Sequence, residues 1–220
     1  MGLLVNKTKQ KELGAFYTSN IIVKYMVDNT LNKIEITKDT RILEPSCGDG
    51  NFLLYIKEYL LNLNFSLNEI EDMVYGVDID KETVEKCIAN IGFSKNIKCN
   101  NTLLMDFNLK FDVVIGNPPY LRVQGIDKEV STQYKKEFKS ATGSYDLYVL
   151  FVEKGLSLLA KDGILNFIMP YKWINSSFGK GLREISKDKV SKFISLERIK
   201  SLMPPPIHLW CGLKIAQMKL

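Results

Sequence analysis

The sequence has little of the chemistry that metal sites and disulfide frameworks require. Among its 220 residues, His208 is the single histidine, and the four cysteines (Cys47, Cys87, Cys99 and Cys211) form no Cys-x-x-Cys pair. These spacings exclude the usual zinc sites and favour a reduced intracellular compartment. We assign no chemical role to His208, Cys87, Cys99 or Cys211, and His208, beside a proline run, is expected to be solvated.

Long apolar runs are also missing. No stretch approaches the ~18 uninterrupted apolar residues of a membrane span, and residues 3–5 are too few for a signal-peptide core. We therefore expect a soluble, cytoplasmic protein. The net charge is +5, from 30 Lys and Arg against 25 Asp and Glu. This surplus is compatible with a nucleic-acid partner without requiring one.

What is present is an alternation of short apolar runs with segments of helical period, beginning at Arg41. This pattern predicts an α/β fold with a mostly parallel twisted sheet and helices on both faces, and the length is that of one domain. Five strands are predicted at residues 41–44, 73–78, 96–99, 111–116 and 164–169. Two more are expected at residues 192–197 and 209–218, separated by a proline loop at residues 203–206.

Helices are predicted between the strands and ahead of them. The apolar residues at helical spacing are Phe52, Ile56, Leu60 and Leu63, then Val84, Cys87, Ile88 and Ile91, then Tyr148, Phe151, Val152, Gly155, Leu156 and Leu159. A helix before the first strand is expected to begin at Thr18 and Ser19 and to bury one face made of Ile21, Ile22, Tyr25 and Met26.

The longest polar interval covers residues 121–146. It holds five basic residues, which are Arg122, Lys128, Lys135, Lys136 and Lys139. We expect a mobile surface loop with some helix, and a loop of this length inside a compact domain is more often functional than not.

The most specific feature is a buried strand that stops abruptly at Asn117-Pro118-Pro119-Tyr120. Ligands of open α/β sheets bind beyond the carboxyl ends of the strands. The prolines remove two amide donors, so carbonyl oxygens stand beside the Asn117 side-chain oxygen. Hydrogen bonds from a planar amino group to Asn117 Oδ1 and the Pro118 carbonyl would localise the nitrogen lone pair, and Tyr120 would stack on a base swung out of the duplex. The plainer interpretation is a strand-ending turn.

A second ligand-binding pattern lies upstream, at residues 44–50. Gly48 and Gly50 allow a ligand to approach the backbone closely, and Glu44 places a carboxylate at a strand tip. The run lacks the third glycine of the dinucleotide fingerprint. Its acids would repel a pyrophosphate. They suit instead a ligand that carries a positively charged methionine ammonium group and a sulfonium group.

Acids after the next two strands complete this pattern. Asp78 ends a strand where an acid typically accepts hydrogen bonds from ribose hydroxyls, whereas Asp80 is more readily interpreted as a helix cap. Asp106 and Phe107 would offer a carboxylate to an adenine amino group and a ring to its face. For this pair, a surface acid beside a core aromatic residue is the plainer interpretation.

Together these residues resemble the gamma-type adenine-specific DNA methyltransferases of restriction-modification systems, which methylate an amino group. The matching segments are residues 14–18, 43–50, 76–80, 106–107, 117–120 and 145–148, the last running into Phe151. The resemblance covers the chain to about residue 185, and the Tyr17-Thr18 block in first place is typical of the gamma type. It implies a Rossmann-like class I methyltransferase fold, normally of seven strands with the last antiparallel.

The resemblance implies S-adenosylmethionine as the cofactor and double-stranded DNA as the partner. Thr18 and the glycine loop would hold the methionine end, Asp78 the ribose, and Asp106, Phe107, Ile79 and Phe151 the adenine. The cofactor-binding residues expected on this basis are Tyr17, Thr18, Glu44, Ser46, Cys47, Gly48, Asp78, Ile79, Asp106, Phe107 and Phe151. The catalytic residues are Asn117, Pro118, Pro119 and Tyr120, which would engage the extruded adenine.

Residues 1–220 are thus expected to form one catalytic and cofactor-binding domain, with residues 1–35 completing the cofactor site. The sequence departs from the family at residues 202–208, where an aromatic residue normally packs against the target base. We expect the large recognition domain of the gamma type to be absent, so that a separate subunit or a missing C-terminal domain would read the bases. The alternatives are methylation of a protein glutamine amide or of RNA, and an inactive truncated relic that still binds cofactor.

Overall fold

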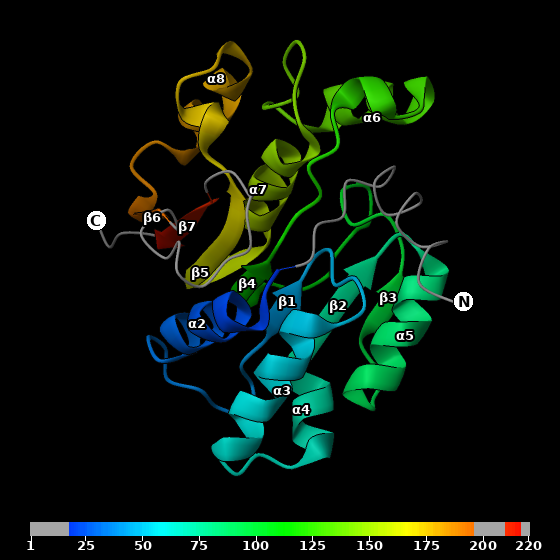
Figure 1. The fold of residues 1–220 in the computed structure, drawn as a ribbon, viewed down its shortest axis with the longest axis vertical. Helices are drawn as coiled ribbons and strands as arrows, with labels where there is room; N and C mark the ends of the chain where they lie inside the picture. Colours follow the sequence, from blue (N-terminus) through cyan, green and yellow to red (C-terminus); the bar gives the residue numbers. More distant parts are fainter. Residues whose placement is uncertain (1–17, 196–209, 217–220) are drawn as a thin grey trace.

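The computed structural model describes residues 18–195 and 210–216, which form one seven-stranded sheet in the order β3-β2-β1-β4-β5-β7-β6 (Figure 1). The parallel strands are β1 (Ile42–Glu44), β2 (Val74–Asp78), β3 (Ile97–Cys99), β4 (Phe111–Gly116) and β5 (Leu159–Pro170). β7 (Trp210–Ala216) runs antiparallel between β5 and β6 (Val190–Ser195). The predicted Rossmann-like fold, with its antiparallel last strand, is confirmed.

β5 begins earlier than the sequence indicates. Leu159, predicted as the end of a helix, pairs with Phe111 as the first residue of β5, and the register then shifts before Ile164 pairs with Val113. Asp162, at φ +63°, lies in this irregularity. The helical prediction for Leu159 is therefore wrong, because pairing with the strand at its side outweighs the local spacing.

Helices cover both faces of the sheet (Figure 1). The helices are α2 (Asn20–Leu31), α3 (Asn51–Asn62), α4 (Leu67–Met73), α5 (Lys81–Ile91), α6 (Lys128–Glu137), α7 (Leu147–Leu158) and α8 (Lys180–Ser186). Short 3-10 turns are η1 (Val123–Gly125), η2 (Tyr171–Ile174) and η3 (Ser177–Gly179). None of the helices in the described ranges is both long and apolar enough to cross a membrane.

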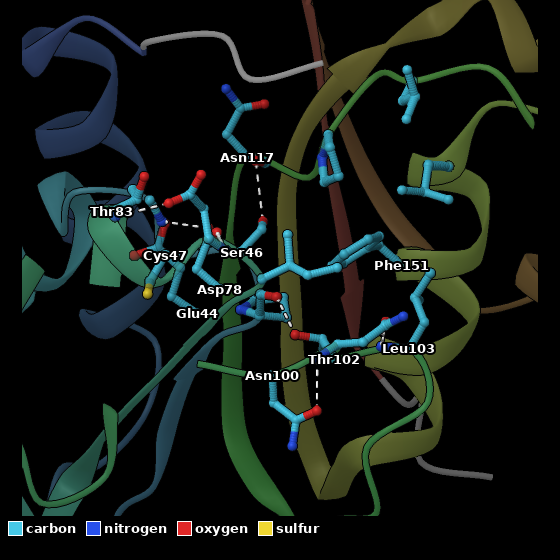
Figure 2. A pocket seen from close by; sticks show the side chains of 18 of the residues that line it. Glu44, Ser46, Cys47, Asp78, Thr83, Asn100, Thr102, Leu103, Asn117 and Phe151 are labelled. Carbon is cyan, nitrogen blue, oxygen red and sulfur yellow. Dashed lines mark hydrogen bonds between the residues drawn. The ribbon is translucent and has the colours of Figure 1, made fainter. Parts of the chain in front are cut away.

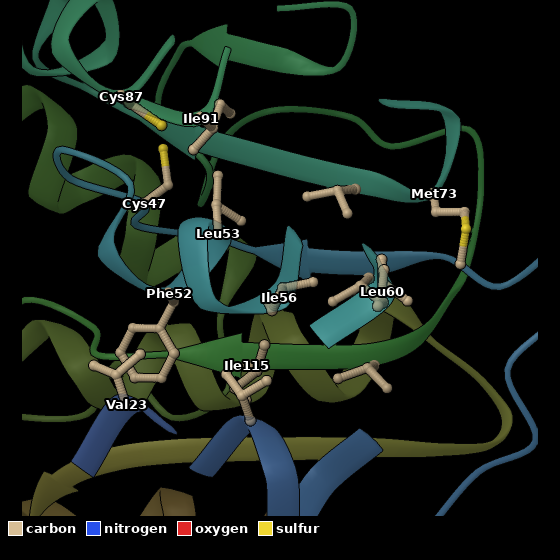
Figure 3. Close-up of a cluster of buried hydrophobic side chains, with 14 of the residues drawn as sticks. Val23, Cys47, Phe52, Leu53, Ile56, Leu60, Met73, Cys87, Ile91 and Ile115 are labelled. Carbon is tan, nitrogen blue, oxygen red and sulfur yellow. The ribbon is translucent and has the colours of Figure 1, made fainter. Parts of the chain in front are cut away.

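Two apolar clusters lie on opposite faces of the sheet, because successive strand residues point in opposite directions. Ile42 belongs to the cluster under α2, α3 and α5, whereas Leu43 belongs to the one under α7. Figure 3 shows α3 in the first cluster, with Phe52 and Ile56 near Val23 and Ile115 and with Leu53 near Ile91. These clusters fix the strands whose carboxyl ends carry the site.

Two helical details differ from the sequence predictions. α2 buries Ile22, Val23, Met26, Val27, Thr30 and Leu31. The predicted face was wrong in part, since Ile21 is 52% and Tyr25 38% exposed. α4 was not predicted at all, although a capping box, in which Ser66 and Glu69 each accept from the other's backbone N–H, marks its start.

The segment at residues 121–146 contains the expected helix, α6, together with η1. It is more firmly packed than a surface loop, because Tyr134, Phe138, Ala141 and Tyr145 are buried in the cluster under α7. Its ends are joined, since Leu147 N donates to the Leu121 carbonyl at 2.8 Å. The segment therefore forms a wall beside the carboxyl edge of the sheet.

Candidate functional site

A cavity of about 450 Å³ opens at the carboxyl ends of β1, β2 and β4 (Figure 2). The predicted site residues that line it are Thr18, Glu44, Ser46, Cys47, Gly48, Asp78, Ile79, Asn117, Pro119 and Phe151. Its volume is within the ~300–1,000 Å³ typical of small-molecule sites. The fold thus brings together residues that are far apart in the sequence, while Tyr17 lies outside the described residues.

The glycine loop after β1 is tied to the end of β2. Gly48 and Gly50 adopt positive φ values of +54° and +91°, which favour glycine. Gly48 N donates to Asp78 Oδ2 at 2.9 Å, and Asp80 N donates to Asp78 Oδ1 at 3.0 Å. Burial raises the pKa of Asp78, and these backbone hydrogen bonds partly oppose that shift. Asp78 holds the loop in place and keeps lone pairs for a ligand in the cavity.

Glu44 is a buried acid with an unsatisfied oxygen. Its side chain is only 2% exposed, and Oε2 has no hydrogen-bond partner in the described part of the chain. Burial, and then the nearby Cys87 and Asp78, raise its pKa well above the ordinary value. A Cβ at Gly116 would lie 3.1 Å from Glu44 Cγ, so the glycine makes room for the carboxyl group. An unpaired acceptor that lines a cavity is suited to a cationic ligand.

Asn117 is held by residues from two other segments. Its Nδ2 donates to Thr18 Oγ1 at 3.0 Å, and its backbone carbonyl accepts from Ser46 Oγ at 3.2 Å. In this arrangement Nδ2 is directed at Thr18, and Oδ1 is the acceptor at the other end of the amide. Thr18 and the glycine loop, both expected at the methionine end of the cofactor, thus lie next to the Asn117 loop, a neighbourhood that the sequence did not predict.

Tyr120 points inward. Its hydroxyl donates toward Asn117 Oδ1 and lies 3.0 Å from the Ile168 carbonyl. Its ring packs edge-to-face on Tyr148 with the centroids 6.0 Å apart, and burial raises its pKa well above the ordinary value. Neither Tyr120 nor the buried Pro118 lines the cavity. The stacking of Tyr120 on a base stays a prediction, and it requires this side chain to move.

Asp106 and Phe107 are not brought to the cavity. Asp106 is exposed, and Phe107 packs edge-to-face on Phe111 at 5.7 Å with Lys154 over its ring. A turn directly after β3, in which Met105 N donates to the Asn101 carbonyl at 2.8 Å, carries the pair past the site. The sequence expectation that these two enclose an adenine therefore has no support in their positions.

The residues that follow β3 immediately take this place, and the sequence analysis missed them. Asn100, Asn101, Thr102 and Leu103 line the cavity, and Figure 2 shows three of them across from Asn117. Thr102 Oγ1 donates to the Pro45 carbonyl at 2.6 Å. Their position directly after the predicted third strand could have identified them, because ligands of such sheets bind beyond the carboxyl ends of the strands.

The outer wall of the cavity is apolar and comes from the segment at residues 121–146 and from α7. Its residues are Leu121, Gly125, Ile126, Val130, Tyr134, Leu147 and Phe151. Tyr134 OH accepts from Asn101 Nδ2 at 2.9 Å and so joins α6 to the loop after β3. One end of the cavity is thus acidic and polar, and the other presents apolar surface for a planar group.

Comparison with known sequences gives a family match over most of the chain. The profile of the family described as "Eco57I restriction-modification methylase" matches residues 24–201. Type II methyltransferase M.BstVI of Geobacillus stearothermophilus is 30% identical over 226 residues, which cover 89% of this chain and 40% of that protein. Type II methyltransferase M.BanIII of Aneurinibacillus aneurinilyticus is 31% identical, covering 80% of this chain and 33% of that protein. The chain thus spans less than half of these two relatives.

Solved structures share the fold. A putative class I S-adenosylmethionine-dependent methyltransferase from Listeria monocytogenes superposes with a TM-score of 0.68 at 20% identity, covering 91% of this chain and 59% of that one. The type IIL restriction-modification enzyme MmeI, in complex with DNA, gives a TM-score of 0.70 at 14% identity, covering 98% of this chain and 39% of that one. At these identities the likeness concerns the fold alone.

Proposed function

The chain belongs to the Eco57I restriction-modification methylase family, and on that premise we propose that it transfers a methyl group from S-adenosylmethionine to the 6-amino group of adenine in DNA. The observation that carries the proposal is the geometry of one cavity. It holds a buried acid with one unsatisfied oxygen, Glu44, a strand-end acid, Asp78, and the amide of Asn117, whose nitrogen is directed at Thr18.

The residues of the cavity fit this cofactor. Glu44 Oε2 is an unsatisfied buried acceptor, which suits the ammonium and sulfonium charges. Asp78 has accepted one backbone N–H on each oxygen, and each oxygen retains a lone pair for a ribose hydroxyl. The apolar wall around Ile126, Val130 and Phe151 suits the adenine. The cofactor, when bound, supplies an electrophilic methyl group, so the protein needs no strong general base.

The task left to the protein is to make a weak nucleophile reactive. The amino group of adenine is planar because its lone pair is delocalised into the ring. We expect Asn117 Oδ1 and the Pro118 carbonyl to accept its two N–H groups, which favours a pyramidal nitrogen with a localised lone pair. Thr18 keeps the amide in the correct orientation through the 3.0 Å bond to Nδ2. The Tyr120 hydroxyl, which is bonded to Oδ1 in the structure, must yield this position to the base.

The proposal is tested by single-turnover transfer of labelled methyl groups to adenine-containing duplex DNA. If the Asn117 contact strengthens toward the transition state, Asn117→Ala should lower the transfer rate by at least about 100-fold, the scale of one positioned electrostatic contact, and leave cofactor affinity unchanged. Near-normal transfer by this variant would refute the mechanism.

The position of the label identifies the substrate. Label at the 6-amino group of adenine supports the proposal. Label on a protein glutamine or on RNA, with DNA unmodified, would replace the substrate class. Cofactor binding without transfer to any of the three would indicate an inactive protein.

A further inference from the structure

Two exposed cations lie beside the Asn117 loop, and the proposed chemistry uses neither. Arg122 follows Tyr120 by two positions, and its side chain is 80% exposed. Lys172, in η2, is exposed directly after β5, and β5 is paired with β4, which ends in the Asn117 loop. The two side chains therefore belong to neighbouring strand ends of the sheet.

A short antiparallel ribbon decides where Arg122 points. Val123 N donates to the Tyr145 carbonyl at 3.0 Å, Leu147 N donates to the Leu121 carbonyl at 2.8 Å, and Arg122 is bridged to Asp146 between them. Leu121 and Leu147 line the cofactor cavity. Because successive residues of such a ribbon alternate in direction, Arg122 and Asp146 face away from that cavity.

Asp146 lies beside Arg122. Its Oδ1 lies 3.9 Å from Arg122 Nε, which is longer than a hydrogen bond, and its side chain is 24% exposed. Burial raises the pKa of Asp146, whereas the positive charges of Arg122 and, to a lesser degree, Lys172 lower it. The cluster of two cations and one acid carries a net positive charge beside the loop.

The backbone under Lys172 is firmly held. The neighbouring Trp173 is buried, and Arg183 Nη1 donates to the Trp173 carbonyl at 2.6 Å and to the Ser176 carbonyl at 2.8 Å. Lys172 is thus an exposed side chain on a firmly held turn, and Arg122 lies on the ribbon.

We propose that Arg122 and Lys172 bind phosphates of the DNA strand that flank the extruded adenine. This inference rests on the proposed function. Extruding a base rotates its nucleotide about the backbone, so the flanking phosphates have to be held while the base occupies the Asn117 site. Arg and Lys are the usual phosphate ligands, and such contacts position the DNA without reading its sequence. Asp146 competes with the phosphates for the same cations.

The test compares duplex binding by the whole chain at several salt concentrations, measured by fluorescence anisotropy with a labelled adenine-containing duplex. The double variant Arg122→Ala/Lys172→Ala should bind at least about tenfold more weakly at low salt. The negative slope of log K against log salt should become less steep by roughly 1.8, because each lost phosphate contact accounts for about 0.9. Lys161→Ala is the matched control, since Lys161 is exposed near the start of the same strand, β5.

Asp146→Asn separates phosphate binding from a structural role. If the acid competes with phosphate, this variant should bind duplex about two- to threefold more tightly, because roughly one unit of opposing charge is removed. A purely structural pairing of Asp146 with Arg122 predicts weaker or unchanged binding. Arg122→Lys, which keeps the charge, should retain most of the salt slope.

The inference is overturned if the double variant matches Lys161→Ala in affinity and slope, if Asp146→Asn weakens binding or leaves it unchanged, or if the wild-type chain does not bind duplex at low salt. Calorimetric cofactor affinity should be equal in all variants, which shows that the site is intact. Failure of the proposed function is a separate result, namely wild-type protein that binds duplex but leaves no label on adenine.

Discussion

The acids predicted at the carboxyl edge of the sheet differ in their hydrogen bonds and in their exposure. Both oxygens of Asp78 accept backbone N–H groups, whereas Glu44 keeps one oxygen unsatisfied in a buried position. Asp106, the third acid expected near a cofactor, is exposed outside the cavity. The three residues therefore give different expectations for the same kind of substitution.

Asp78→Ala should weaken S-adenosylmethionine binding by about 1 to 3 kcal/mol, the scale of charge-assisted hydrogen bonds to a ligand. Asp106→Ala is the matched control and should leave the affinity unchanged. Isothermal titration calorimetry measures both. Equal losses in the two variants, or no loss in Asp78→Ala, would contradict the placement of the ribose at β2.

Glu44→Gln should stabilise the ligand-free protein at neutral and alkaline pH and weaken cofactor binding. The folded-state pKa of Glu44 is raised, so the folded chain holds more protons than the unfolded chain above the ordinary pKa. The stability that Glu44 contributes is present below that pKa and is lost as pH rises toward the folded value. The variant lacks this loss, so its stability relative to the wild-type protein should rise from pH 4 to pH 8. Thermal unfolding of both proteins across this range measures the difference, and a constant difference would contradict the assignment.

At the scale of elements, the segment at residues 121–146 serves both sides of the site. Its inner side buries Phe138 and supplies Ile126 and Val130 to the cavity, and its first residues form the ribbon that carries Arg122. The Tyr134 to Asn101 bond joins α6 to the loop after β3. α6 therefore helps to hold the wall against which we expect the cofactor adenine to lie.

Tyr134→Phe removes this bond and keeps the ring. We expect cofactor affinity to fall by about 0.5 to 1.5 kcal/mol, the net value of one hydrogen bond, with Tyr134→Ala losing more. Gln133→Ala, an exposed neighbour on the same helix, should bind as the wild-type protein does. Unchanged affinity in Tyr134→Ala would show that α6 does not contribute to the cofactor site.

At the scale of the whole molecule, the sheet and its helices provide a cavity at the carboxyl edge of the sheet, and the full chain carries a modest net positive charge. The net charge of +5 favours DNA, whereas the chain spans 40% of M.BstVI and 33% of M.BanIII. Phosphate contacts need only exposed cations, but base readout needs side chains that enter a groove.

We accordingly expect these 220 residues alone to bind duplex DNA weakly, without sequence preference and with strong salt dependence. Competition binding among duplexes of unrelated sequence, at two salt concentrations, measures both properties. Tight binding to one sequence at physiological salt would show that a reading element lies within this chain.

The sequence alone determined the order of the strands along the chain and most of the helices between them, α4 and α8 excepted, as well as the Rossmann-like class and the strand ends that carry Glu44, Asp78 and Asn117. These follow from local periodicity and from the rule that parallel strands end at one edge, so they need no knowledge of distant contacts. In α2 the apolar residues can be read as a buried face that begins at Ile21 or as one that begins at Ile22. Packing of the helix against α3 and β5 buries the face that begins at Ile22.

Tertiary structure also decided the direction of the side chains at the site. Tyr120 turns toward the Ile168 carbonyl on the neighbouring strand, a contact that its own sequence neighbourhood does not encode. Asp106 and Phe107 are carried past the cavity by the turn at Asn101, and the ribbon at Arg122 requires the start of α7 beside it. The order of the motifs was enough to predict where the site lies. Which side chains point into the site depends on contacts with residues far along the chain, and these exist only in the tertiary structure.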